Sequence, residues 1–82
     1  MNAQELRDKI LKLLARAAPE ADVAAIAGDE PLQRALDLDS FDFLNFLVAL
    51  RDELGVTIEE SDYGTLRTLD DLMRFLEPRV ES

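Results

Sequence analysis

Cysteine and histidine are both absent from this sequence of 82 residues. Without cysteine, the chain can form no disulfide and offers no thiolate to a metal ion. Without histidine, it also lacks the side chain that most often acts as a general base near neutral pH. These two absences exclude most zinc sites and the usual nucleophile–base pairs. We therefore expect no catalytic residues and no dedicated metal site.

Long apolar stretches are absent as well. The longest run, Phe46–Leu50, is far too short to cross a bilayer. Charged residues interrupt the apolar pattern of the N-terminal residues, which therefore do not resemble a signal peptide. We expect a cytoplasmic chain without membrane insertion, folded as a single domain over residues 1–82 with a modest core.

Positive charge is scarce in the middle of the chain, and the formal net charge is −9. Residues 20–62 hold twelve acidic residues against only Arg34 and Arg51. Phosphate groups would meet a negative surface there, so we do not expect a nucleic acid partner. The negative electrostatic potential of this surface favours protein partners with basic docking patches. An acidic surface that serves only solubility is the alternative.

Helical periodicity dominates the remaining sequence. Apolar residues at helical spacing predict helices over residues 4–17 and 40–54, the first closed by Pro19 and the second by Gly55. A third helix is predicted to begin at Thr68. The expected fold class is therefore all-α: a small helical bundle with three main helices and one short helix.

The connecting segments carry weaker signals. Residues 59–63 are expected to form the short helix, closed by Gly64. In the last helix Asp71 completes a capping-box pair, and Pro78 is expected to stop the helix. Residues 19–38 form the least regular stretch. Three leucines are predicted to pin it to the core: Leu32, Leu36 and Leu38.

Residues 36–46, LDLDSFDFLNF, allow three interpretations: a strand, a calcium loop or the start of a helix. A strand fails because Ser40 occupies the position where the apolar alternation needs a hydrophobic residue. A calcium loop that began at Asp37 would need glycine where Asp42 stands and a bidentate glutamate where Val48 stands. The start of a helix is the interpretation that remains.

The residues around Ser40 suit the start of a helix. Asp39 is a good N-cap, and Asp42 follows three residues later, so both carboxylates would lie at the positive end of the helix dipole. Ser40 would then present its hydroxyl to solvent. Because no histidine can activate it, Ser40 is not an autonomous nucleophile.

The helix predicted over residues 40–54 carries more apolar surface than one helix of a bundle usually buries. At about 100° per residue, a second apolar ridge lies about 130° away from the core stripe. The core stripe contains Phe43, Phe46, Leu47, Leu50 and Leu54, and the ridge contains Phe41, Leu44 and Val48. An exposed ridge beside acidic residues is typical of a docking surface. The alternative is that the ridge packs under residues 19–38.

The sequence resembles the acyl carrier proteins. The tripeptide Asp39-Ser40-Phe41 is similar to the Asp-Ser-Leu signature that this family has at the start of its second helix. The segments VTIEE at 56–60 and TLDDLM at 68–73 follow in the family's order, so the resemblance covers nearly the whole chain. The tripeptide alone is a weak motif, but its place in a small acidic helical chain without histidine or cysteine is specific.

This resemblance implies a carrier function rather than an enzyme. A phosphopantetheinyl transferase would attach a covalent phosphopantetheine arm, taken from coenzyme A, to Ser40. The thiol of the arm would hold acyl groups as thioesters. Acyl-loading and acyl-using enzymes of fatty-acid, lipid or secondary-metabolite synthesis would be the partners of a monomeric carrier.

The resemblance also implies roles for individual residues. Asp39 and Asp42 would take part in recognition by the transferase and by partner enzymes. The ridge of Phe41, Leu44 and Val48 would form the apolar contact surface. The acyl chain would enter the bundle near three apolar residues: Phe46, Leu50 and Ile58.

Several positions depart from the common carriers of fatty-acid synthesis. Leu38 precedes the motif where those carriers often have a small residue, and Phe41 replaces leucine. Asn45 and Arg51 stand where the docking helix tends to be acidic, and Glu59 replaces a frequent proline. These departures indicate a specialised acyl carrier protein with different partners.

Two alternatives stay open. A peptidyl or aminoacyl carrier would have the same arm with an amino acid as cargo, although such carriers commonly have glycine where Leu38 stands. An unmodified acidic docking module would keep the surface without the serine chemistry. An enzyme is the weakest interpretation, because so small a core leaves little room for a pocket.

Overall fold

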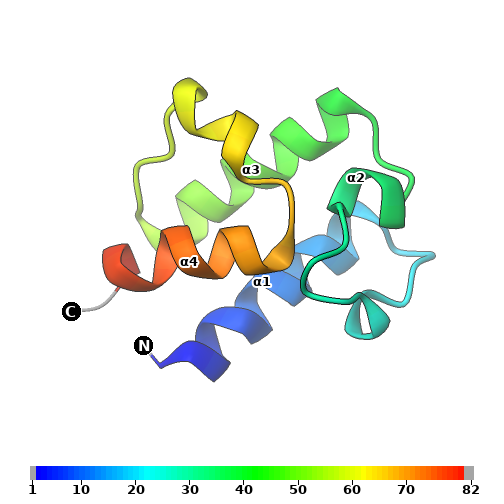
Figure 1. Cartoon of the computed structure of the whole chain (residues 1–82), viewed down its shortest axis with the longest axis horizontal. Coiled ribbons are helices and arrows are strands. Elements are labelled where there is room, and N and C mark those ends of the chain that lie inside the picture. Colours follow the sequence, from blue (N-terminus) through cyan, green and yellow to red (C-terminus); the bar gives the residue numbers. More distant parts are fainter. Residues whose placement is uncertain (1, 81–82) are drawn as a thin grey trace.

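The computed structural model describes residues 2–80, and its regular structure is helical. The elements are α1 (Ala3–Ala17), η1 (Val23–Ala25), α2 (Leu32–Ala35), α3 (Ser40–Leu54), η2 (Glu60–Thr65) and α4 (Leu69–Val80). The long helix α1 packs against both α3 and α4, and Figure 1 shows the short α2 beside the start of α3. The predicted all-α bundle with three main helices is confirmed.

Helix α1 follows the predicted range closely and begins one residue earlier, at Ala3. The side chain of Asn2 caps it by accepting a hydrogen bond of 2.8 Å from the backbone N–H of Glu5. Its apolar stripe faces the core, and the buried residues are Leu6, Ile10, Leu13 and Leu14. Burying each such leucine or isoleucine stabilises the fold by about 1.5–3 kcal/mol.

Helix α3 has the bounds that the sequence predicts, because both ends carry strong local signals. The carboxylate of Asp39 accepts a hydrogen bond of 2.7 Å from the backbone N–H of Asp42. At the other end, Gly55 has a left-handed φ of 67° and donates its N–H to the carbonyl of Arg51 at 2.9 Å. Glycine adopts this conformation without the steric cost of a Cβ atom.

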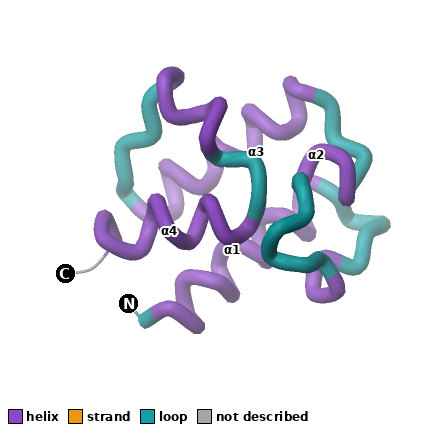
Figure 2. Tube along the Cα trace, viewed as in Figure 1, coloured by secondary structure: helices purple, strands orange, loops and turns teal. Residues whose placement is uncertain are grey.

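The connection between α1 and α3 contains a helix that the sequence does not predict. Figure 2 shows this connection as loop interrupted by short helices, of which α2 is a single turn. So short a helix leaves no periodic pattern to detect. Asp37 follows with a left-handed φ of 53°, which lets the chain turn into α3. The three predicted anchors of this connection are all buried: Leu32, Leu36 and Leu38.

The short helix predicted over residues 59–63 lies at Glu60–Thr65 instead. Gly64 is inside this helix rather than after it, so the prediction that Gly64 closes the helix is wrong. The hydroxyl of Thr65 donates a hydrogen bond of 2.9 Å to the carbonyl of Asp62 and extends the helix by the last residue. A side-chain hydrogen bond therefore outweighs the helix-breaking tendency of glycine here.

Helix α4 continues to Val80, so the prediction that Pro78 stops it is wrong. Proline has a φ that suits a helix, and in the last turn it removes only one backbone hydrogen bond. The guanidinium of Arg79 donates a hydrogen bond of 2.7 Å to the carbonyl of Phe75 and lies 3.8 Å from the centre of the Phe75 ring. These contacts stabilise the turn that contains the proline.

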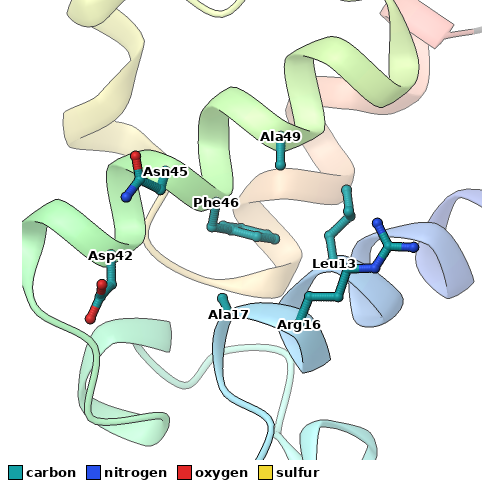
Figure 3. A pocket seen from close by; sticks show the side chains of 7 residues that line it. All are labelled: Leu13, Arg16, Ala17, Asp42, Asn45, Phe46 and Ala49. Atoms are coloured by element: carbon teal, nitrogen blue, oxygen red, sulfur yellow. The ribbon is translucent and has the colours of Figure 1, made fainter.

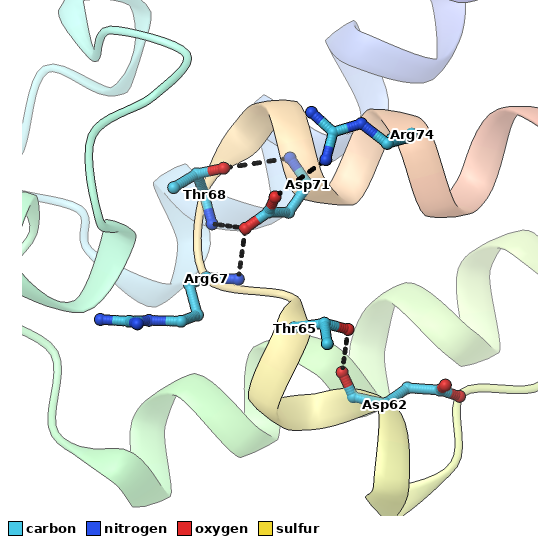
Figure 4. A network of polar contacts seen from close by, with 6 residues as sticks. All are labelled: Asp62, Thr65, Arg67, Thr68, Asp71 and Arg74. Carbon is cyan, nitrogen blue, oxygen red and sulfur yellow. Dashed lines mark hydrogen bonds and ion pairs between the residues drawn. The ribbon is translucent and has the colours of Figure 1, made fainter.

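The start of α4 has the predicted capping box (Figure 4). The backbone N–H of Asp71 donates to the hydroxyl of Thr68 at 3.0 Å, and the Asp71 carboxylate accepts from the backbone N–H groups of Thr68 and Arg67, both at 3.2 Å. Partial burial on its own would raise the pKa of Asp71. The hydrogen bonds, together with nearby Arg74, outweigh it and hold the pKa of this carboxyl below its usual value.

We expect Asp71→Asn to lower the free energy of unfolding at neutral pH by about 1 kcal/mol, the size of a typical helix-capping contact. Because the folded pKa is lowered, the ionised carboxylate stabilises the fold above the unfolded pKa, and this contribution is lost as the pH falls below about 4. The difference from wild type should therefore shrink in acid. Urea unfolding at several pH values measures it.

The control is Asp70→Asn, which removes the same charge from the same turn at an exposed side chain. An equal loss of stability in both variants, or a difference from wild type that stays constant into acid, would contradict the capping role of Asp71.

Candidate functional site

Ser40 is the first residue of α3 and is exposed. The Asp39 carboxylate, which caps the helix, and the exposed Asp42 flank it. The backbone N–H groups of the first turn and the helix dipole make this end of α3 locally positive. Because the chain contains no histidine, no imidazole can take the proton of the serine hydroxyl. The arrangement presents a hydroxyl to solvent without activating it.

The apolar ridge next to Ser40 is largely exposed. The side chain of Phe41 is 69% exposed and that of Leu44 is 38% exposed, while Val48 is half-buried. The alternative in which this ridge packs under residues 19–38 is therefore wrong for Phe41 and Leu44. Two exposed apolar side chains on one helix, beside the Asp42 carboxylate, are suited to contact with another protein.

A hollow of about 330 Å³ opens beside Ser40. It is lined by Gln33, Ser40, Phe43, Leu44, Leu47, Tyr63, Gly64 and Arg67. Its apolar lining comes mainly from α3, and the other lining residues come from α2, from η2 and from the segment before α4. No local pattern in the sequence connects Gln33, Tyr63 and Arg67 with Ser40, so their place beside the serine was not predicted.

The three residues predicted to receive the acyl chain are all buried: Phe46, Leu50 and Ile58. Leu50 and Ile58 lie within the closed core and line neither this hollow nor a second one. Phe46 lines the second hollow, of about 370 Å³, where Figure 3 shows its ring facing residues of α1. That hollow is formed by Leu13, Arg16, Ala17, Asp42, Asn45, Phe46 and Ala49. The structure thus brings the three residues into one core, and neither of these two hollows is lined by all three.

Comparison with known proteins identifies the family. Residues 5–76, most of the chain, match the family model described as a phosphopantetheine attachment site. The chain belongs to this family. The attachment-site match spans all three long helices apart from a few terminal residues.

The chain is also similar to curated acyl carrier proteins. The one from Lactobacillus acidophilus is 29% identical over 77 residues, covering 94% of this chain and 95% of the relative. The one from Thermosynechococcus vestitus is 26% identical over 80 residues, covering 98% of both. A solution structure from Anaplasma phagocytophilum, described as a candidate acyl carrier protein, has a TM-score of 0.87 at 21% identity and covers 100% of this chain and 96% of its own. It shares the fold.

Membership in the phosphopantetheine attachment family confirms the acyl carrier resemblance seen in the sequence. The prosthetic group is a covalently attached phosphopantetheine, and the protein is a carrier rather than a catalyst. The family's partners are a phosphopantetheinyl transferase and acyl-handling enzymes. Within residues 2–80, none of the helices combines the length and apolar character needed to span a membrane.

The residues around Ser40 fit a phosphopantetheine arm. The exposed hydroxyl oxygen of Ser40 can form the ester bond to phosphorus that a phosphodiester requires. The start of α3 also offers the positive end of a helix dipole to the phosphate. The adjoining hollow is lined by three apolar residues of α3, Phe43, Leu44 and Leu47, which would offer such an arm an apolar surface.

Proposed function

We propose that Ser40 carries the phosphopantetheine arm and that the chain delivers acyl groups, held as thioesters, to enzymes of fatty-acid, lipid or secondary-metabolite synthesis. One observation carries this proposal: Ser40 is exposed and is the first residue of α3, between Asp39 and Asp42. It lies within the region that matches the attachment-site family. The bound arm supplies a terminal thiol, which this cysteine-free chain lacks.

Loading would use the Ser40 hydroxyl as the acceptor. Its oxygen forms the new bond to phosphorus while the phosphorus–oxygen bond within the diphosphate of coenzyme A breaks, and the nucleotide part leaves. The hydroxyl proton would pass to a base of the transferase, because the chain has no histidine and the Asp39 carboxylate is engaged with the backbone N–H of Asp42. The role of this chain would be to present the serine at the capped start of a helix.

The docking surface would combine charge with apolar contact. Asp39 and Asp42 would attract basic patches on partner enzymes, and the ridge of Phe41, Leu44 and Val48 would then be buried on contact. Two further features support a specialised set of partners. Asn45 is uncharged, and Arg51, in the last turn of α3, donates two hydrogen bonds of 3.3 Å to the Asp52 carboxylate and offsets its negative charge.

The test of the proposed function is a loading assay. The purified chain is incubated with coenzyme A and a broad-specificity phosphopantetheinyl transferase, and the intact mass is measured before and after. We expect a single gain of mass that corresponds to one arm, and peptide mapping should locate it on the peptide that contains Ser40. An unchanged mass would contradict the carrier function and favour an unmodified docking module.

We expect Leu44→Arg to lower kcat/KM for loading by the transferase about tenfold, equivalent to about 1.4 kcal/mol of lost contact. The new charge would repel a basic partner and could not pack against it. Because Leu44 is 38% exposed, helicity measured by circular dichroism should not change. Initial rates of loading over a range of protein concentrations give kcat/KM.

The control is Ala24→Arg, which adds the same charge at an exposed residue of η1. Equal losses in the two variants would mean that net charge alone matters. Loss of helicity in Leu44→Arg would mean that the ridge belongs to the core. The monomeric state, the cytoplasmic location, the lack of nucleic acid binding and the single domain over residues 1–82 stay predictions.

A further inference from the structure

The main chain of Arg67 is held on both sides. Its N–H donates to the Asp71 carboxylate at 3.2 Å, and its carbonyl accepts from the N–H of Leu32 at 2.9 Å. The next residue, Thr68, forms an isolated antiparallel bridge with Pro31. The Arg67 side chain therefore starts from a defined point between α2 and α4.

The Arg67 side chain extends away from the Asp71 carboxylate (Figure 4) and lines the hollow beside Ser40. The Asp71 carboxylate is occupied by the capping box and by Arg74, at 3.4 Å. Between residues 2 and 80, the Arg67 guanidinium forms no ion pair. Arg67 is also the single charged residue among those that line this hollow. A free cation thus lines the same hollow as the acceptor serine.

A phosphodiester on Ser40 would add a negative charge to an acidic site. Asp39 and Asp42 flank Ser40, and the chain has a net charge of −9. The helix end offsets part of this repulsion. A guanidinium offsets more, because its planar set of donors matches the oxygens of a phosphate and forms charge-assisted hydrogen bonds.

We propose that Arg67 is a positioning residue for the arm, whose guanidinium pairs with the phosphodiester on Ser40. The pairing holds the phosphate end of the arm beside the hollow that Phe43, Leu44 and Leu47 help to line, so that this end is not free in solvent. This inference rests on the proposed function, in which Ser40 carries the arm. It adds a residue outside the serine motif, and outside α3, that controls how the arm is held.

The test uses the loaded protein, with the arm on Ser40 verified by intact mass. In wild type, loading should shift the side-chain Nε–H resonance of Arg67, and the ³¹P resonance of the phosphodiester should differ from that of the same loaded chain unfolded in urea. In Arg67→Gln, we expect the ³¹P resonance to move toward the unfolded position and the phosphate to become more mobile by ³¹P relaxation. Arg67→Lys should recover part of the effect.

Arg34→Gln is the matched control. It removes the same charge from an exposed residue of α2 that does not line the hollow, and it should leave the ³¹P resonance at the wild-type position. Circular dichroism should show all variants folded, because the contacts that hold Arg67 in the fold are made by its main chain.

A loaded Arg67→Gln with the ³¹P resonance and relaxation of wild type would overturn the role of Arg67 while leaving the carrier function intact. So would equal shifts in Arg67→Gln and Arg34→Gln. A wild-type chain that gains no mass would overturn the carrier function and this inference together, so the two failures are distinguishable.

Discussion

Replacing Ser40 with alanine is expected to abolish the gain of mass on incubation with coenzyme A and a transferase. Alanine has no hydroxyl oxygen to form the bond to phosphorus. The flanking carboxylates are poor nucleophiles and would not replace the serine hydroxyl in this reaction. Because Ser40 is exposed and Asp39 provides the cap of α3, the substitution should change stability by about 0.5 kcal/mol or less. Intact mass and circular dichroism measure the two effects.

The control is Ser61→Ala, which removes an exposed serine of η2 and keeps Ser40. This variant should gain the same mass at the same rate as wild type. A gain of mass that survives in Ser40→Ala would place the arm on another residue and refute the assignment of Ser40.

The second large effect is expected in the core of the bundle. Leu50→Ala should lower the free energy of unfolding by about 2–5 kcal/mol, because the leucine is 0% exposed and its removal leaves a cavity. For a chain of this size the total is about 4–12 kcal/mol, so the loss is a large fraction of the stability. Urea unfolding followed by circular dichroism measures the change.

The matched control makes the same substitution on the other face of the same helix. Leu44→Ala should cost about 1 kcal/mol or less, because Leu44 is 38% exposed and belongs to the ridge. Equal losses in the two variants would mean that both faces of α3 are packed, and the ridge would then not be available for docking. Loading of Ser40 should slow in Leu44→Ala, whereas Leu50→Ala should be affected only to the extent that it unfolds.

The bounds of α3 could be predicted because each signal lies within a few residues of the boundary it marks. Asp39 caps the helix through a contact three residues along the chain, and Gly55 takes the left-handed conformation one residue after the end. The excess apolar surface of α3 was also visible in the sequence, since the angle between two ridges follows from helix geometry alone. The exposure of this ridge could not be predicted from the sequence, because it depends on where residues 19–38 lie in the fold.

The two errors about Gly64 and Pro78 have one physical origin, which is contacts that act against a local preference. Gly64 stays within η2 because the Thr65 hydroxyl binds the Asp62 carbonyl, and α4 runs past Pro78 with support from Arg79. The single turn of α2 left no periodic signal. The helix propensity of a residue describes its average behaviour in many environments. A single side-chain hydrogen bond, which contributes about 1 kcal/mol, can outweigh that preference.

The sequence by itself determined the carrier family, the three long helices and the position of the candidate attachment serine, because these depend on patterns within a segment. The tertiary structure decided what surrounds Ser40. It exposes Phe41, closes the core around Leu50, and brings Arg67 to the hollow beside the serine across a gap of many residues in the chain. Such neighbours are set by how α2, η2 and α4 pack together. The charge and shape of the surface around Ser40 therefore depend on the packing of the whole bundle and do not follow from any one segment.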